Sequence, residues 1–157
     1  MTAGRVVTAE RVETLVALLA GLPGHALDAV RTHFVRLAEP NEINPGTPDL
    51  YAALVRLADA AATRRRAGGR GHFPAPGPGD LAGAVRRLDT VELRACVLAM
   101  RRSADDLADT AVAPLFAALR DLVEAEERRR DEAGWARIRR AERRARAECA
   151  ALGVPFA

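Results

Sequence analysis

Few side chains in this 157-residue sequence combine a reactive type with a spacing that supports catalysis. Of the three histidines, His25 and His33 stand about two helical turns apart, which is too far to share one metal ion, and His72 lies alone in a Gly/Pro-rich stretch. The single serine, Ser103, has no base near it in the sequence. We therefore expect no catalytic residue, no metal and no cofactor, and a protein that is not an enzyme.

The remaining polar clusters also have simpler explanations than a reaction site. The three aspartates within residues 105–109 fall where we expect a helix to begin, and acids there stabilise the helix dipole without any catalytic role. The Gly-rich run 68–71 lacks the following Lys-Ser/Thr and the preceding strand of a phosphate-binding loop. Cys96 and Cys149 lack the spacing of a zinc site or a disulfide framework. We expect no small-molecule substrate.

The strongest pattern is a charged run near the C-terminus, which is too regular for a disordered tail. It predicts one long helix over about 121–149, mixed in charge at first and then basic, with six arginines and one acid between residues 137 and 146. A narrow seam of small and apolar residues follows one face, and its members are Trp135, Ile138, Ala141, Ala145, Cys149 and Leu152. The arginines form two stripes, one of Arg137, Arg140 and Arg144 and one of Arg139, Arg143 and Arg146.

Upstream of the seam, we expect the helix to be stabilised by its own ion pairs. Glu124 with Arg128 and Glu126 with Arg130 are spaced four residues apart, and each such pair contributes about 0.2–0.5 kcal/mol. Gly134 is the weak point, because glycine in a helix costs about 1 kcal/mol relative to alanine. The helix could bend there.

Two kinds of macromolecule suit this basic helix. Packing of Trp135 and Ile138 against a partner protein, or against a second copy of the chain, would make the protein a small helical adaptor or accessory subunit whose arginines steer an acidic partner. The alternative is nucleic acid, bound through phosphate contacts of Arg128, Arg129, Arg130 and the two stripes. A solvated extension without a partner is a third interpretation. A membrane surface is disfavoured, because the apolar face is mostly alanine.

A weak helix-turn-helix pattern at residues 13–32 also bears on nucleic acid. Gly21 would be its turn glycine. Its buried positions would be Val16, Leu22, Leu27 and Val30. The exposed side of the second helix lacks the side chains that read base edges, so Arg31 and Arg36 could contact phosphates only. A plain helical hairpin explains the same residues.

Helix start and stop signals predict the elements that carry these residues. Thr47 is expected to cap the third helix, with Pro48 in its first turn. Ser103-Ala-Asp-Asp106 resembles a capping box that opens the sixth helix, in which Pro114 either causes a kink or begins a fresh helix. We expect one helix to begin after Thr8 and another to begin after Thr90. Two more helices are expected over about 25–38 and 80–88.

These signals predict an all-α fold, a bundle of about six helices with a long charged C-terminal helix, because no segment shows the alternation of a strand. Residues 1–123 would form the core, as two helical subregions separated by a Pro/Gly-rich loop at 67–79. Residues 124–157 would form the extended basic helix and its short apolar end. No stretch approaches the roughly 20 apolar residues of a membrane span.

The composition of the chain offers a simple explanation for its many arginines. All 24 basic residues are arginine, a bias that GC-rich codon usage of the bacterial type explains, and the formal net charge of +3 does not require an anionic partner. The N-terminus reaches charged residues before any apolar stretch develops, so we expect no signal peptide. Together with the two lone cysteines, this predicts a cytoplasmic protein.

Overall fold

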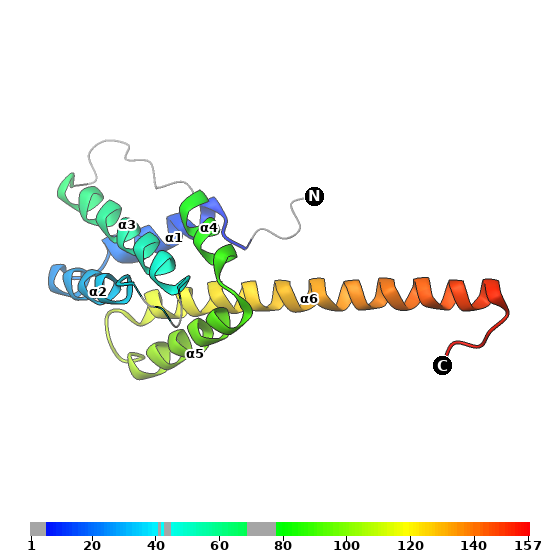
Figure 1. The fold of residues 1–157 in the computed structure, drawn as a ribbon. Helices are drawn as coiled ribbons and strands as arrows, with labels where there is room; N and C mark the ends of the chain where they lie inside the picture. Colours follow the sequence, from blue (N-terminus) through cyan, green and yellow to red (C-terminus); the bar gives the residue numbers. More distant parts are fainter. Residues whose placement is uncertain (1–5, 41, 43–44, 69–77) are drawn as a thin grey trace.

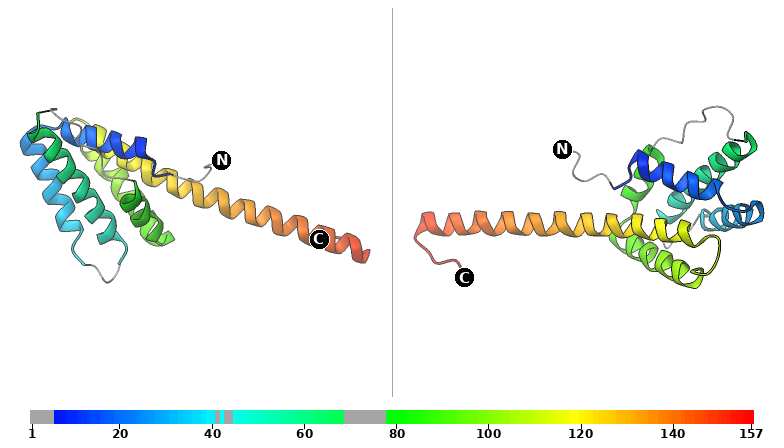
Figure 2. Two further views of the ribbon diagram at one scale, coloured as in Figure 1. Left: turned by 90° about the horizontal axis from the view of Figure 1, so that it is seen from above. Right: turned by 180° about the vertical axis from the view of Figure 1, so that it is seen from behind.

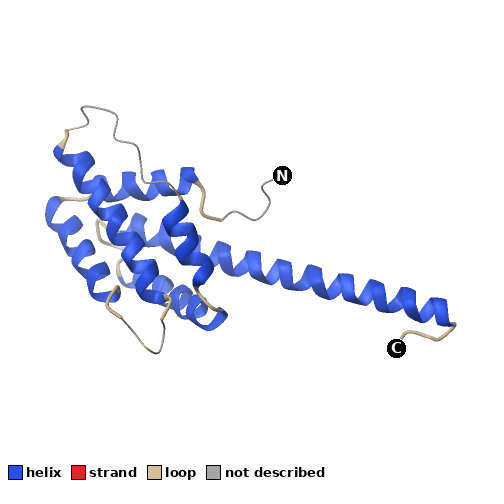
Figure 3. Cartoon of the chain, turned by 45° about the horizontal axis from the view of Figure 1, so that its top comes forward, coloured by secondary structure: helices blue, strands red, loops and turns tan. Residues whose placement is uncertain are grey.

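The computed structural model describes residues 6–40, 42, 45–68 and 78–157, and within these ranges the chain forms six α-helices and no strand (Figures 1 and 3). The helices are α1 (Ala9–Ala20), α2 (Gly24–Leu37), α3 (Thr47–Arg66), α4 (Gly79–Arg87), α5 (Thr90–Asp106) and α6 (Ala113–Leu152). The predicted all-α fold is confirmed. No described helix combines the length and the hydrophobicity that crossing a membrane requires. Most of the predicted loop at 67–79 lies outside the described residues.

The helices form two packed groups. In one, α5 packs against α6, and in the other, α3 packs against its neighbours. α3 packs against α1, α2 and α4, while α1 also touches α6 (Figure 2). Phe34 of α2 joins the two groups, because its ring lies 5.9 Å from that of Tyr51 on α3 and 6.4 Å from that of Phe116 on α6. One hydrophobic core therefore includes the first turns of α6. We use the term bundle for α1 to α5 together with residues 113–130 of α6.

The first hairpin follows the sequence signals closely. The Thr8 hydroxyl accepts a hydrogen bond from the Arg11 N–H at 3.1 Å, as expected of an N-cap. α1 ends before Gly21, and α2 begins three residues later. The apolar spacing of the two helices is buried except at Leu37, which also falls on the apolar face of α2 but is exposed at its end. The buried residues are Val12, Leu15, Val16, Leu19, Leu22, Leu27, Val30 and Phe34.

The cap of α3 differs from the prediction. Thr47 is the first residue of the helix, and its side chain makes no capping hydrogen bond. The buried carboxylate of Glu92 caps it instead, accepting from the N–H of Gly46 at 2.5 Å and that of Thr47 at 3.1 Å. A β-carbon at Gly46 would lie 2.7 Å from Glu92 Oε2, so a larger residue would displace the carboxylate that caps the helix. The start of α3 is therefore capped by a carboxylate that is distant in the sequence.

The capping box also lies elsewhere than predicted. Asp89 accepts from the Glu92 N–H at 2.8 Å, and Glu92 in turn accepts from the Asp89 N–H at 3.4 Å. Ser103 to Asp106 form the last turn of α5, because Met100 and Ala104 are buried and keep that helix packed to its end. The expectation that Ser103 opens the sixth helix is wrong.

Six residues separate the end of α5 from the start of α6, which has Pro114 in its first turn. Proline fits this position because the first N–H groups of a helix have no partner within it. Of the two possibilities for Pro114, the structure shows a fresh helix and not a kink. The aspartates of residues 105–109 therefore belong to the end of α5 and the connection after it.

We predict that Glu92→Ala lowers the free energy of unfolding by about 2–3 kcal/mol, because it leaves partly buried backbone N–H groups of α3 and α5 without their acceptor. Chemical denaturation followed by circular dichroism measures this. Asp106→Ala is the control, since its pair with Arg102 is exposed at 3.7 Å and should contribute less than about 0.5 kcal/mol. An equal, small effect of both substitutions would contradict this role of Glu92.

Candidate functional site

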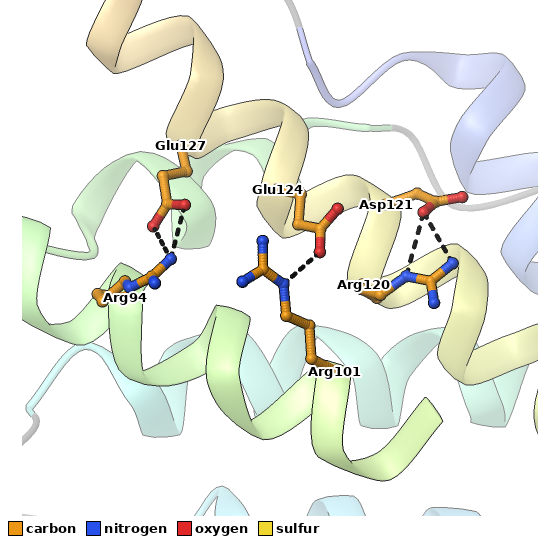
Figure 4. Close-up of polar contacts among 6 residues, drawn as sticks. All are labelled: Arg94, Arg101, Arg120, Asp121, Glu124 and Glu127. Atoms are coloured by element: carbon orange, nitrogen blue, oxygen red, sulfur yellow. Dashed lines mark hydrogen bonds and ion pairs between the residues drawn. The ribbon is translucent and has the colours of Figure 1, made fainter. Parts of the chain in front are cut away.

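Two ion pairs attach α6 to α5 within about one turn after the last buried apolar residue of α6. Arg101 Nε donates to Glu124 at 2.6 Å, and Arg94 Nη1 donates to Glu127 at 3.0 Å (Figure 4). The predicted partner of Glu124 was Arg128, but the structure pairs it with a side chain of another helix. These contacts hold α6 against the bundle beyond Val123, its last buried apolar residue.

A second attachment centres on the buried carboxylate of Glu126. It accepts from Arg129 at 2.8 and 2.9 Å and from Arg130 Nε at 2.9 Å, so the predicted Glu126–Arg130 pair is confirmed. Arg130 continues to α4, donating to the carbonyl oxygens of Leu88 at 2.8 Å and Val85 at 3.1 Å. These carbonyls lie at the end of α4, where backbone acceptors have no partner within the helix. The guanidinium therefore ties α6 to α4.

The carboxylates of this attachment are held in their charged forms. Burial by itself raises the pKa of Glu126, but the hydrogen bonds from Arg129 and Arg130 outweigh it, and the net pKa lies below the usual value. The hydrogen bond from Arg101 likewise lowers the pKa of Glu124. Both acids contribute to stability as carboxylates.

Beyond Arg130, α6 leaves the bundle and continues to Leu152 as one helix (Figure 1). We call residues 131–152 the extension; at 1.5 Å per residue it is about 33 Å long. None of its residues is buried, and Trp135 and Ile138 are 61% and 49% exposed. The helix runs through Gly134 without a break. The predicted seam is thus an uncovered face of a projecting helix.

The extension ends at a glycine. Gly153 has a φ of 67°, a left-handed conformation that favours glycine, and the Val154 N–H donates back to the Cys149 carbonyl at 2.9 Å. Phe156 then turns back, and the guanidinium of Arg146 lies 5.2 Å from its ring centroid. The short apolar end therefore packs on the extension itself.

Charge is balanced differently in the bundle and in the extension. Among the described residues, ten arginines of the bundle form ion pairs with carboxylates. None of the six stripe arginines forms an ion pair in the described structure, and all of them are exposed. Unpaired positive charge thus gathers along residues 137–146.

Glu142 is a member of this surface that the seam pattern did not include. Steps of three and four residues from Trp135 pass through Ile138, Glu142, Ala145, Cys149 and Leu152, which is the spacing of a coiled-coil seam. Ala141 borders this line. Glu142 makes no ion pair in the described part of the chain. One acid therefore sits in the middle of an otherwise small and apolar face.

The other residues expected to contact nucleic acid do not form one surface. Arg129 already donates hydrogen bonds to Glu126, and Arg130 donates to carbonyl oxygens at the end of α4. Arg31 of α2 pairs with Asp59 of α3 at 2.6 Å. Arg36 and Arg128 are exposed, one on α2 and one on α6. The free arginines that do share a surface are those of the extension.

The residues with reactive side chains are not gathered into a site. Burial raises the pKa of the Cys96 thiol to about 11, which keeps it protonated and unreactive. No three His, Cys, Asp or Glu side chains of the described residues lie close enough to hold a metal ion. A hollow between α4 and α6 is lined mainly by apolar and backbone groups, with Arg86 and with Glu126 and Arg129, which bond to each other. His72 lies outside the described residues.

Comparison with known proteins gives no significant match among family models, curated proteins or solved structures. The case for a function therefore rests on the geometry and charge of the extension. Its projecting helix, its exposed seam and its unpaired arginines describe a surface suited to binding a macromolecule.

The attachment of α6 predicts a pH dependence. A pKa lowered on folding adds stability above the usual glutamate value of about 4.3, and this stability is lost as the pH falls through the lower value of the folded state. Glu126→Gln should therefore lose less free energy of unfolding than the wild type between about pH 5 and pH 3. Denaturation curves at stepped pH measure this. Glu148→Gln, on the exposed extension, should follow the wild type, and identical slopes for Glu126→Gln would refute the assignment.

The extension should be the least protected helical segment, with Gly134 as a cause. No atom outside the local helix lies within 4 Å of a β-carbon at this position, so Gly134→Ala is accommodated. It should stabilise the local helix by about 1 kcal/mol and slow amide exchange in residues 131–152 about fivefold. Ala147→Gly should have the opposite effect. Hydrogen exchange by mass spectrometry reports both, and exchange unchanged by either variant would be evidence against a helical extension in solution.

Proposed function

We propose that the protein is a small, non-enzymatic helical adaptor or accessory subunit that binds another protein through the extension of α6. The observation that carries this proposal is an exposed seam, led by Trp135 and Ile138, on a helix that projects beyond its own bundle. A projecting helix with an apolar line at three- and four-residue spacing is the form in which helices pack on one another.

The bundle would serve to present this helix. Glu124, Glu126 and Glu127 fix the first half of α6 to α4 and α5, so the extension starts from a turn that is already formed. Helix nucleation is the unfavourable step of helix formation, and continuation from a formed helix avoids it. The extension would therefore lose less conformational entropy on binding than a free peptide of the same sequence.

Apolar and charged side chains of the extension would contribute to binding in different ways. Trp135 and Ile138 supply the apolar contact, since a partly exposed tryptophan is the residue type that most often dominates interface energetics. The stripe arginines would raise the rate of encounter with an acidic partner and select against basic ones. The single tryptophan of the chain thus lies on the proposed interface.

Nucleic acid is the second candidate, and the unpaired arginines favour it. Six exposed guanidinium groups on one projecting helix could contact phosphates, and such binding would weaken steeply with salt. It would not need the apolar seam. The two candidates therefore differ in which face of the extension they use.

A photo-cross-linking residue placed in the full-length chain tests the proposal in cells of the source organism. Placed at position 138, on the seam, it should give a nuclease-resistant adduct with another protein, identified by mass spectrometry. Placed at position 140, on the opposite face, it should give little of that adduct. The seam adduct should disappear when Trp135 is also changed to alanine, because the main apolar anchor is then removed.

Two results would count against this function. Adducts that nuclease removes, formed as readily from position 140 as from position 138, would support the nucleic-acid candidate. The absence of any adduct from position 138 would leave the extension as a solvated helix without a partner.

A further inference from the structure

We infer that the occupant of the seam is an acidic amphipathic helix of a different protein, and not a second copy of this chain. The inference rests on the proposed function, that the extension binds a protein, and adds the chemistry of the partner. It follows from where the charges stand relative to the seam on a continuous helix.

The two charged residues on one flank of the seam are both arginines. Arg139 and Arg146 follow the seam on one side, one position after Ile138 and after Ala145 respectively. In a coiled coil these are flanking positions whose charges meet the partner helix and set partner choice. The opposite flank carries Gly134, Ala141 and Glu148. The arginine flank therefore determines which helix can pack here.

A parallel pair of two copies would leave these arginines unmatched. Each flanking arginine would face the opposite flank of the other copy, so that Arg139 meets Gly134 and Arg146 meets Ala141. At the centre of the seam, Glu142 would face Glu142 of the other copy. Two like charges in a partly desolvated seam oppose association.

An antiparallel pair of two copies is disfavoured for another reason. If Trp135 faces Leu152 of the other copy, the flank that carries the arginines meets itself. Arg139 then faces Arg146 of the other copy, and the same contact occurs twice by symmetry. Like charges placed opposite one another at an interface reduce affinity and select against that pairing.

A partner helix that satisfies the seam has a definable pattern. It carries Glu or Asp on the flank that meets Arg139 and Arg146, and a lysine or arginine at the seam position that meets Glu142. It offers small or aliphatic side chains to Trp135, which is large and needs space. Glu142 would fix the register, because a charged group in a seam tolerates only the alignment that pairs it.

Two synthetic peptides test this, both without tryptophan and with the same leucine- and isoleucine-lined seam over three heptads. One carries glutamate at the flanking positions and the other carries lysine, and both have lysine opposite Glu142. Titrated into the full-length protein, the acidic peptide should shift Trp135 emission to shorter wavelength and bind more than about tenfold tighter than the basic one. Ile138→Asp should reduce its affinity more than about tenfold.

Two charge-matched double variants separate the seam flank from general attraction. Arg139→Glu with Arg146→Glu should reverse the preference, so that the basic peptide binds more tightly. Arg140→Glu with Arg144→Glu makes the same change of charge on the opposite face and should keep the preference for the acidic peptide. All of these residues are exposed, and circular dichroism should show the fold unchanged.

Three outcomes would overturn the inference. They are equal loss of acidic-peptide binding in both double variants, failure of the acidic peptide to shift Trp135 emission, and a dimer in sedimentation equilibrium that Ile138→Asp dissociates. If either peptide result fails while position 138 still cross-links to another protein, the acidic-helix inference falls and the proposed function stands. If the cross-link is also absent, both fall.

Discussion

The buried carboxylate of Glu126 determines how far the bundle reaches along α6. It is one of two charged side chains in the described residues that the core encloses, and it is compensated by hydrogen bonds from two arginines of the next turn. Arg130 passes this connection on to the end of α4. A buried carboxylate without such partners would be strongly destabilising, so these residues are required together. Among the described residues, no hydrogen bond or ion pair joins α6 to the bundle beyond Arg130.

Glu92 plays a comparable part in the first turn of α5. One carboxylate closes the capping box of its own helix and also caps α3, so the start of two helices depends on one side chain. Both buried acids therefore connect the ends of helices that are far apart in the sequence. The aliphatic core supplies most of the burial, whereas these two acids fix how helices of the bundle meet.

Sequence patterns predicted the helices well and their long-range polar contacts poorly. The hydrophobic spacing of α1 and α2 and the stop at Gly153 are local properties, readable from a few neighbouring residues. The cap on α3 comes from Glu92, some 45 residues away, and the partner of Glu124 comes from α5, so no local pattern could reveal either.

The capping-box pattern was genuine at Asp89 and misleading at Ser103, where buried apolar residues carry the helix onward. α5 leaves Val91 and Leu98 exposed because its neighbours cover only part of it. The seam and its arginine stripes were readable from the sequence. That all six stripe arginines lack carboxylate partners was not, since it depends on which acids the fold brings near.

The charges of the extension are unfavourable for an isolated helix. Arg139 with Arg143 and Arg140 with Arg144 are like-charge pairs four residues apart, and each destabilises a helix by a few tenths of a kcal/mol. The helix dipole does not compensate for them, because its effect is confined to the last turn and that turn contains no basic residue. GC-rich codon usage explains why the cations are arginines, but not why six of them share residues 137–146 with a single acid, Glu142. An anionic partner would relieve the repulsion along the whole segment at once. The segment that is least favourable as a free helix is thus the one with most to gain from binding an acidic surface.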